Sequence, residues 1–244
     1  MRISSFARFA LLLACASGAF AGTYNPFNDF AATNVSGNLW TYWSSNSTTV
    51  AGYSGSISLM GTLIAGCGGG ANSPCWDQTS GVANLLLQNA SGADEPFPNS
   101  VAPNGDLTYY TRSGIVLLRF TAPSTSSYSV SGFFQGAATV PESSQDVIAV
   151  NQNVGGALLN SSGALAFGTQ RTFSFSNVSL NAGDTLDFLV AGVSTTSGSN
   201  SIATAFSATI TSGAATVPEP GTFGLTAACL GLAFLRLRKR AANS

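Results

Sequence analysis

The chain contains no histidine, so the residues that could do chemistry are mainly carboxylates. Without an imidazole, nucleophile systems of the Ser-His-Asp or Cys-His type are excluded. A pair of carboxylates could still hydrolyse a glycosidic bond, and Asp184 and Asp187 are the most evident pair. Residues three positions apart in a strand, however, point to opposite faces of the sheet. We therefore expect Asp184 to cap a turn, Asp187 to be solvated on an outer face, and the protein not to be an enzyme.

The tryptophans offer a binding chemistry, because an exposed indole can stack on a sugar ring. Trp40 and Tyr42 share one face of a predicted strand, and Trp43 points to the other face. Trp43 and Trp76 are the candidate residues for ligand stacking. The alternative is that each packs in the core or at its rim, which is the more frequent role of an aromatic residue in a β-sandwich.

Metal or cofactor chemistry has little support in the sequence. Asp146, Asn151 and Asn153 could supply oxygen ligands to a structural calcium ion, although turns also explain the asparagines. A zinc site would need about four ligands, and histidine is absent. The glycine-rich run at 68–70 lacks the Gly-Lys-Ser/Thr ending of a phosphate-binding loop. We expect no cofactor, with a structural calcium ion as the open alternative.

Short strands must position these residues, because apolar and polar side chains alternate between turn residues. The segment 114–121 is apolar on both faces, as expected of a central strand, and a phase shift between Phe175 and Val178 predicts a bulge near Ser176-Asn177. Asn181–Asp184 is predicted to join two strands as a short hairpin. The predicted strands are 39–43, 56–64, 82–87, 106–112, 114–121, 126–135, 145–151, 171–180, 184–191 and 202–210. Together they predict an all-β protein with one β-sandwich domain, a jelly roll, over 22–213.

The composition of this segment excludes nucleic-acid binding. Its nine acidic residues and three arginines, Arg112, Arg119 and Arg171, give a net charge of −6, and it contains no lysine. Binding to nucleic acid depends on neutralising phosphates, which such a surface cannot do. Serine, threonine, glycine and asparagine supply its polarity, as in many extracellular β-proteins.

The two ends of the chain predict export. Residues 1–21 have the arginines, the apolar stretch and the Ala19-Phe20-Ala21 cleavage site of a secretory signal peptide. A linker at 214–221 precedes an apolar run and a basic end at 222–240, predicted to be one short C-terminal membrane-spanning helix. The basic end predicts that everything before Val217 lies outside the cytoplasm.

The tail also resembles a known sorting signal. Its elements are a Pro-Glu-Pro box, a short apolar helix and a terminal basic cluster, formed by Val217, Pro218, Glu219, Pro220, Gly221, Arg236, Arg238, Lys239 and Arg240. This arrangement resembles the PEP-CTERM signal of Gram-negative bacteria. The resemblance implies handling by a membrane-embedded exosortase after Sec export, and an association with exopolysaccharide. An ordinary C-terminal anchor with a proline hinge is the alternative.

Export bears on the cysteines, because disulfides form outside the cytoplasm. Between the predicted signal and the tail only Cys67 and Cys75 remain, separated by a glycine-rich loop. In an oxidising compartment such a pair predicts a disulfide, which would stabilise the fold by roughly 2–3 kcal/mol.

A second resemblance covers most of 28–210. The segments Asn34–Tyr42, Arg119–Pro123, Tyr128–Phe134 and Leu180–Phe188 resemble recurring motifs of a jelly-roll domain in exported bacterial proteins. The resemblance implies a fold like that of carbohydrate-binding modules. Residues 65–105 depart from it, being longer and carrying the cysteine pair, so no binding residue is transferred.

These patterns predict an exported protein of the cell envelope or extracellular matrix. Its unprocessed form would be anchored in the inner membrane by the C-terminal helix. Its predicted role is non-catalytic, structural or adhesive, and linked to exopolysaccharide. A carbohydrate-binding module is the main alternative, and a polysaccharide hydrolase is the third.

Overall fold

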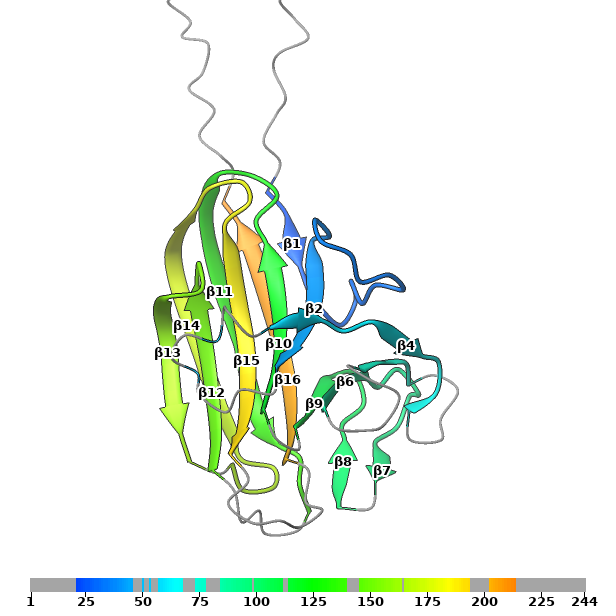
Figure 1. The fold of residues 1–244 in the computed structure, drawn as a ribbon. Coiled ribbons are helices and arrows are strands. Elements are labelled where there is room, and N and C mark those ends of the chain that lie inside the picture. Colours follow the sequence, from blue (N-terminus) through cyan, green and yellow to red (C-terminus); the bar gives the residue numbers. More distant parts are fainter. Residues whose placement is uncertain are drawn as a thin grey trace, which may run out of the picture. The chain divides into compact units, whose positions relative to one another are not determined.

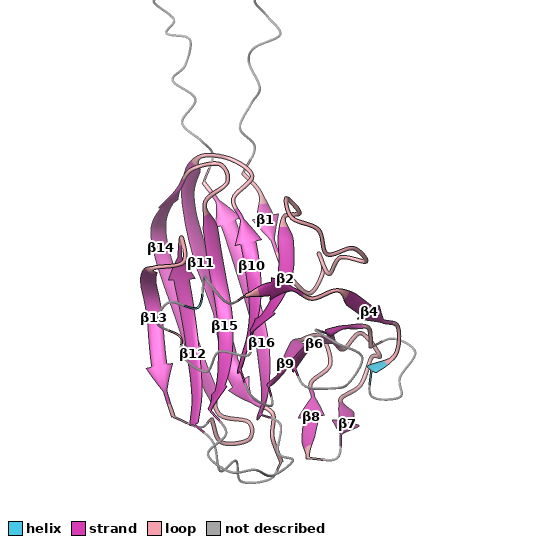
Figure 2. Ribbon diagram, in the orientation of Figure 1, coloured by secondary structure: helices cyan, strands magenta, loops and turns pink. Residues whose placement is uncertain are grey.

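Alternating residues form paired strands throughout the part of the chain that the computed structural model describes. The described residues are 21–45, 50, 53, 57–67, 73–77, 84–97, 99–111, 114–139, 145–163, 165–193 and 202–213. All of them except Ala21 belong to one compact unit, Gly22–Gly213, and strands dominate it (Figure 2). The signal peptide predicted at 1–21, except Ala21, and the linker and helix predicted at 214–240 lie outside the described residues. Among those described, no helix is long and apolar enough to cross a bilayer.

Two antiparallel sheets lie face to face (Figure 1). The larger sheet has eight strands, in the order β14 (Gln170–Leu180), β11 (Ser126–Gly136), β16 (Ile202–Ser212), β9 (Leu107–Thr111), β6 (Asn84–Gln88), β5 (Cys75–Asp77) and β4 (Thr62–Ile64), with β1 (Thr23–Tyr24) also paired to β16. The smaller sheet has six, in the order β13 (Gly156–Ser162), β12 (Gln145–Gln152), β15 (Thr185–Val193), β10 (Gly114–Thr121), β2 (Trp40–Ser45) and β3 (Ser58–Leu59). A separate ribbon pairs β7 (Glu95–Phe97) with β8 (Ser100–Ala102).

The pairing of the last eight long strands is that of a jelly roll. β12 pairs with β13, β11 with β14, β10 with β15, and β9 with β16. These nested pairs form one long antiparallel hairpin, whose successive pairs alternate between the two sheets. Rolling such a hairpin into two sheets gives the jelly-roll topology. The predicted β-sandwich is therefore confirmed.

Aromatic side chains fill the space between the sheets. Trp40, Phe120, Phe134, Phe188 and Phe206 are all at most 2% exposed. Their rings contact each other in tilted pairs, with centroids 5.0–6.3 Å apart, and such pairs add to the stabilisation from burial. Every second residue of β2 and β10 points into this core, namely Trp40 and Tyr42 of β2 and Val116, Leu118 and Phe120 of β10.

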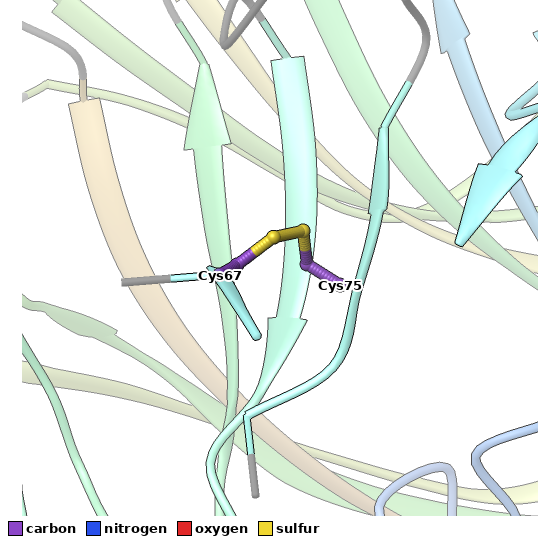
Figure 3. Close-up of a disulfide and its surroundings, with 2 residues drawn as sticks. All are labelled: Cys67 and Cys75. Atoms are coloured by element: carbon purple, nitrogen blue, oxygen red, sulfur yellow. A yellow bond between two sulfur atoms is a disulfide. The ribbon is translucent and has the colours of Figure 1, made fainter. Parts of the chain in front are cut away.

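A second, smaller hydrophobic core lies on the outer face of the larger sheet, where residues of the segment 64–105 pack against it. Leu85, Leu87 and Tyr110 project from the outer face of β6 and β9 into this core. Cys67 and Cys75 join it as a disulfide, with their Cα atoms 5.8 Å apart (Figure 3). The predicted disulfide is confirmed, and its place is this second core.

Most predicted strands agree with observed ones, but β1, β5, β7, β8 and β13 were not predicted. Two further predictions are wrong. The segment predicted as one strand at 56–64 is two strands, because the chain crosses from one sheet to the other at Met60, which is buried in the main core. Asn181–Asp184 is not a hairpin: it joins β14 of one sheet to β15 of the other. The bulge predicted near Asn177 is confirmed by a register shift opposite Tyr128 and by a φ of 60° at Asn177.

Candidate functional site

A row of polar side chains crosses the outer face of the six-stranded sheet. Thr41 of β2 is paired with Arg119 of β10, Arg119 with Asp187 of β15, and Asp187 with Asn151 of β12. Directly opposed residues on neighbouring strands point to the same face and interact. This row, called the polar row below, lies next to an apolar row that begins at Trp43 and continues through the outward side chains of β10 and β15.

The centre of the polar row is a buried ion pair. Arg119 Nε donates to Asp187 Oδ1 at 2.7 Å, and Nη2 donates to Asp187 Oδ2 at 2.9 Å. The Tyr53 hydroxyl donates to the same Oδ2 at 2.6 Å. Asp187 is completely buried, whereas the Arg119 side chain keeps 15% of its surface exposed. The prediction that Asp187 is solvated on the outer face is therefore wrong: it faces outward, but Tyr53 covers it and Arg119 neutralises its charge.

The pKa shifts follow from this geometry. Burial alone would lower the pKa of Arg119, but the hydrogen bonds and the charge of Asp187 outweigh it and raise that pKa. Burial raises the pKa of the Tyr53 phenol, and the charge of Asp187 raises it further. Tyr53 therefore remains a protonated donor and Arg119 a cation over the physiological pH range.

Trp43 lies beside this ion pair and keeps part of its surface exposed. Its Nε1 donates to Thr41 Oγ1 at 2.8 Å, and the guanidinium carbon of Arg119 lies 5.2 Å from its ring centroid. The hydrogen bond and the cation–π contact both fix the orientation of the indole. Among the residues of this face, Trp43 and Arg119 thus offer a held aromatic ring and guanidinium N–H groups to a ligand.

Trp76, the other predicted stacking residue, is not available to a ligand. It is 4% exposed, stacks on Tyr42 with ring centroids 5.7 Å apart, and donates from Nε1 to the carbonyl oxygen of Ala31 at 3.2 Å. The alternative prediction, that a tryptophan of this fold packs in the core, applies to Trp76. The residues predicted for the sorting signal, 217–221 and 236–240, lie outside the described part.

Asp184 and Asp187 do not form a hydrolytic pair. Both oxygens of Asp187 are hydrogen-bonded within the ion pair. Asp184 accepts the Asn181 N–H at 2.8 Å, as predicted for a turn cap. Oxygen atoms of an inverting or retaining pair would instead have to flank a substrate.

The described residues show no gathering of the predicted calcium ligands, and the Asp146 side chain lies outside the described part. Asp146 and Asn151 are five residues apart along β12, or about 16 Å. Asn153 uses its side-chain oxygen to accept the Thr185 N–H at 2.8 Å. No group of three or more His, Cys, Asp or Glu residues that could hold a metal ion occurs in the described part of the chain.

Sequence reasoning missed the polar row, although two signals were present. Arg119 is the single charged residue in the mainly apolar segment 114–121. Asp187 is likewise the single charged residue in the segment 185–191. Pairing these two central strands antiparallel would have brought the two charges together. The contribution of Tyr53 had no signal, because it arrives from a segment between strands.

The solved structures to which this chain is similar share little sequence with it. No family model and no curated sequence matches the chain. Among solved structures, it is similar to a family 35 carbohydrate binding module from Clostridium thermocellum, with 12% identity, a TM-score of 0.27, and coverage of 57% of this chain and 87% of that one. It is also similar to the CBM36-1 domain of a multidomain xylanase from the hindgut metagenome of Trinervitermes trinervoides. There the identity is 11%, the TM-score is 0.30, and the match covers 54% of this chain and 98% of that one.

A third similar structure is the N-terminal cellulose-binding domain of Cellulomonas fimi β-1,4-glucanase C, with 12% identity, a TM-score of 0.24, and coverage of 81% of this chain and 94% of that one. At these identities and TM-scores, the function of those modules does not transfer to this chain. A function for this chain must therefore be inferred from the residues on the outer face of its six-stranded sheet.

Proposed function

We propose that this chain is an exported, non-catalytic protein that binds neutral polysaccharide on the outer face of its six-stranded sheet, near Trp43 of β2. The observation that carries the proposal is Trp43, a partly exposed indole held in place by Arg119 and Thr41. An oriented aromatic ring can pack on the C–H face of a sugar, while the exposed part of the Arg119 guanidinium can donate hydrogen bonds to its hydroxyl groups.

The charge distribution favours a neutral ligand. The charge of Arg119 is already compensated by Asp187, so the site offers hydrogen bonds rather than net positive charge. The segment 22–217 carries a net charge of −6, which repels polyanionic chains at long range. A neutral glycan needs no net positive charge at the site and is not repelled by the negative charge of the segment.

The same geometry supports a role without catalysis. Asp187 is held by Arg119 and Tyr53 and has no free oxygen to act as a nucleophile or base. The chain also lacks histidine. Binding would therefore serve a structural or adhesive role in association with exopolysaccharide.

The proposed location rests on the two ends of the sequence. We propose that the Sec machinery exports the chain and that an exosortase-type membrane protease acts at the box Val217–Gly221, after which the protein resides in the cell envelope or matrix. The Cys67–Cys75 disulfide supports an oxidising compartment.

Affinity gel electrophoresis of the full chain in soluble xylan, β-1,4-galactan and hydroxyethylcellulose tests the binding proposal. We expect retardation by at least one of these neutral polysaccharides, and Trp43→Ala should weaken it about tenfold, or about 1.4 kcal/mol. Phe167→Ala is the matched control, because Phe167 is an aromatic residue that is 58% exposed and lies outside the polar row. Equal binding by the Trp43→Ala variant and the wild type, with both folded, would remove the proposal.

A further inference from the structure

The turn between β12 and β13 holds Val154 in a backbone conformation that valine rarely adopts. Asn153 and Val154 both have positive φ angles, 47° and 67°. These two residues belong to a three-residue loop, 153–155, between the paired Gln152 and Gly156. Two consecutive residues with positive φ also occur in type I′ turns, where the favoured sequence is Asn-Gly. Asparagine tolerates the left-handed region, but a β-branched side chain is crowded there. Glycine is the next residue in the chain, Gly155, and yet valine occupies the left-handed position.

Hydrogen bonds fix this turn in place. The Thr185 N–H donates to Asn153 Oδ1 at 2.8 Å, and the Asn153 N–H donates to the Thr185 carbonyl oxygen at 3.0 Å. They attach the turn to the beginning of β15, two residues before Asp187. Strained residues persist only where the surroundings determine their conformation, and they concentrate at binding and catalytic sites.

The strained conformation places the Val154 side chain on the outer face of the six-stranded sheet. There it is partly buried against the cluster that contains Tyr53, Leu117 and Leu189, and Trp43 packs against the same cluster. Trp43 lies on β2, where the polar row begins, and Val154 follows β12, where the row ends. The two apolar side chains therefore lie at opposite ends of the polar row.

We propose that Val154 is a ligand contact that helps to determine which polysaccharide this face accepts. The inference rests on the proposed glycan-binding function and adds a specificity-determining residue to the same site. A branched apolar side chain can pack on the C–H groups of a sugar and restricts the substituents that fit beside it. Glycine in its place would suit the backbone better but would remove that contact.

Val154→Gly and Val154→Asn test this inference in the full chain, with the same three polysaccharides as probes. Both residues adopt positive φ more readily than valine, so both variants should have a Tm a few degrees above the wild type. Both should nevertheless bind at least about fivefold more weakly to the polysaccharide that the wild type prefers. Val35→Gly is the matched control: Val35 is 53% exposed in the loop before β2, and its loss should leave the affinity unchanged.

Two results would overturn the inference. A higher Tm with unchanged affinity would show that the strain serves no ligand, and a lower Tm in both variants would show that valine is kept for packing. Trp43→Ala separates this failure from that of the proposed function. If it abolishes binding while the Val154 variants bind like the wild type, only the role of Val154 is wrong. If it has no effect, or if the wild type binds none of the probes, the glycan-binding function fails and the inference with it.

Discussion

Asp106 lies in a turn beside a second carboxylate, Asp94, and no hydrogen bond of its own carboxylate occurs among the described residues. Burial, and then the charge of Asp94, raise the pKa of Asp106 from 3.8 to about 6. The folded protein therefore binds a proton at this site more tightly than the unfolded chain does. By linkage, the contribution of Asp106 to stability is fully present below about pH 4 and is lost as the pH rises through about 6.

Asp106→Asn should accordingly stabilise the protein at pH 7.5, by up to about 3 kcal/mol, and leave its stability at pH 3.5 unchanged. Asparagine keeps the backbone hydrogen bonds of this position to Pro103 and Asn89. Thermal unfolding at both pH values measures the difference. Asp94→Asn is the companion variant, since removing that charge should lower the pKa of Asp106. A variant that is destabilised at neutral pH would show that the Asp106 carboxylate has a partner in the folded state.

Asn34 shows, at the same scale, what the segment Asn34–Tyr42 does in the fold. Its side-chain nitrogen donates to the carbonyl oxygens of Tyr42 and Met60, at 2.6 and 2.9 Å, and its side-chain oxygen accepts the Tyr42 N–H at 2.9 Å. Gly37, three residues later, has a φ of 97°, which favours glycine. The motif Asn34–Tyr42 thus fastens the incoming loop to β2, and its role is structural.

At the scale of the elements, β11 has a glycine, Gly132, at a position that faces the core. A Cβ at Gly132 would collide with the Ser207 carbonyl oxygen and lie 2.7 Å from Cζ of Phe173 and 3.0 Å from Cα of Ala208. The missing side chain lets Phe173 of β14 lie over β11 and reach the core rings of the opposite sheet, including Phe188 at 6.0 Å.

Gly132→Ala should therefore destabilise the protein by about 1–3 kcal/mol, because the added methyl group meets backbone atoms that cannot move aside. Chemical denaturation measures the loss. Gly61→Ala is the matched control: its Cβ would have nothing within 4 Å and its φ is not positive, so its stability should change by no more than about 0.5 kcal/mol. Equal losses in the two variants would mean that the gap at Gly132 does not admit Phe173 as described.

The elements that the sequence predicts best are those with a strict alternation. The strictly alternating strands predicted at 126–135 and 202–210 have ends within two residues of the observed β11 and β16, and the bulge at Asn177 was visible as a phase shift. The strand 114–121, which is apolar on both faces, also has the predicted bounds. β13 was missed because Leu158 and Leu159 are adjacent and break the alternation, and because a register shift at Asn151 disturbs its pairing with β12. β5 was missed because only three residues of it are paired.

The candidate site was predicted only in part, for a physical reason. Trp43 was placed on the face opposite Trp40 and Tyr42 from the period of its own strand, which is a local property. The partners of Trp43 depend on the pairing of β2, β10 and β15. The carboxylate of Asp187 is covered in part by Tyr53, which lies 134 positions away in the chain. Which strands pair, and which residues cover a side chain, depend on the whole sheet. Neither can be predicted from the sequence of one strand.

At the scale of the whole molecule, the compact unit Gly22–Gly213 coincides with the segment left between the two predicted processing signals. If both signals act, the mature protein consists of little more than the jelly roll. If the tail is instead an ordinary anchor, the same domain stays attached to the membrane, and its glycan contact would act only at the cell surface. The two cases place the same binding site at different distances from the cell.

Mass spectrometry of the protein isolated from its host separates these cases. Removal of both ends predicts a polypeptide that begins near Gly22 and ends near Pro220, found in the envelope or medium. A chain that retains the basic cluster Arg236–Arg240 and fractionates with the membrane would support the simple anchor and exclude exosortase processing. Replacing Pro218 and Pro220 by alanine sharpens the test, because it alters the box while leaving the apolar run and the basic end intact. This variant should then accumulate uncleaved in the membrane if the box is recognised, and should be distributed like the wild type if it is only a hinge.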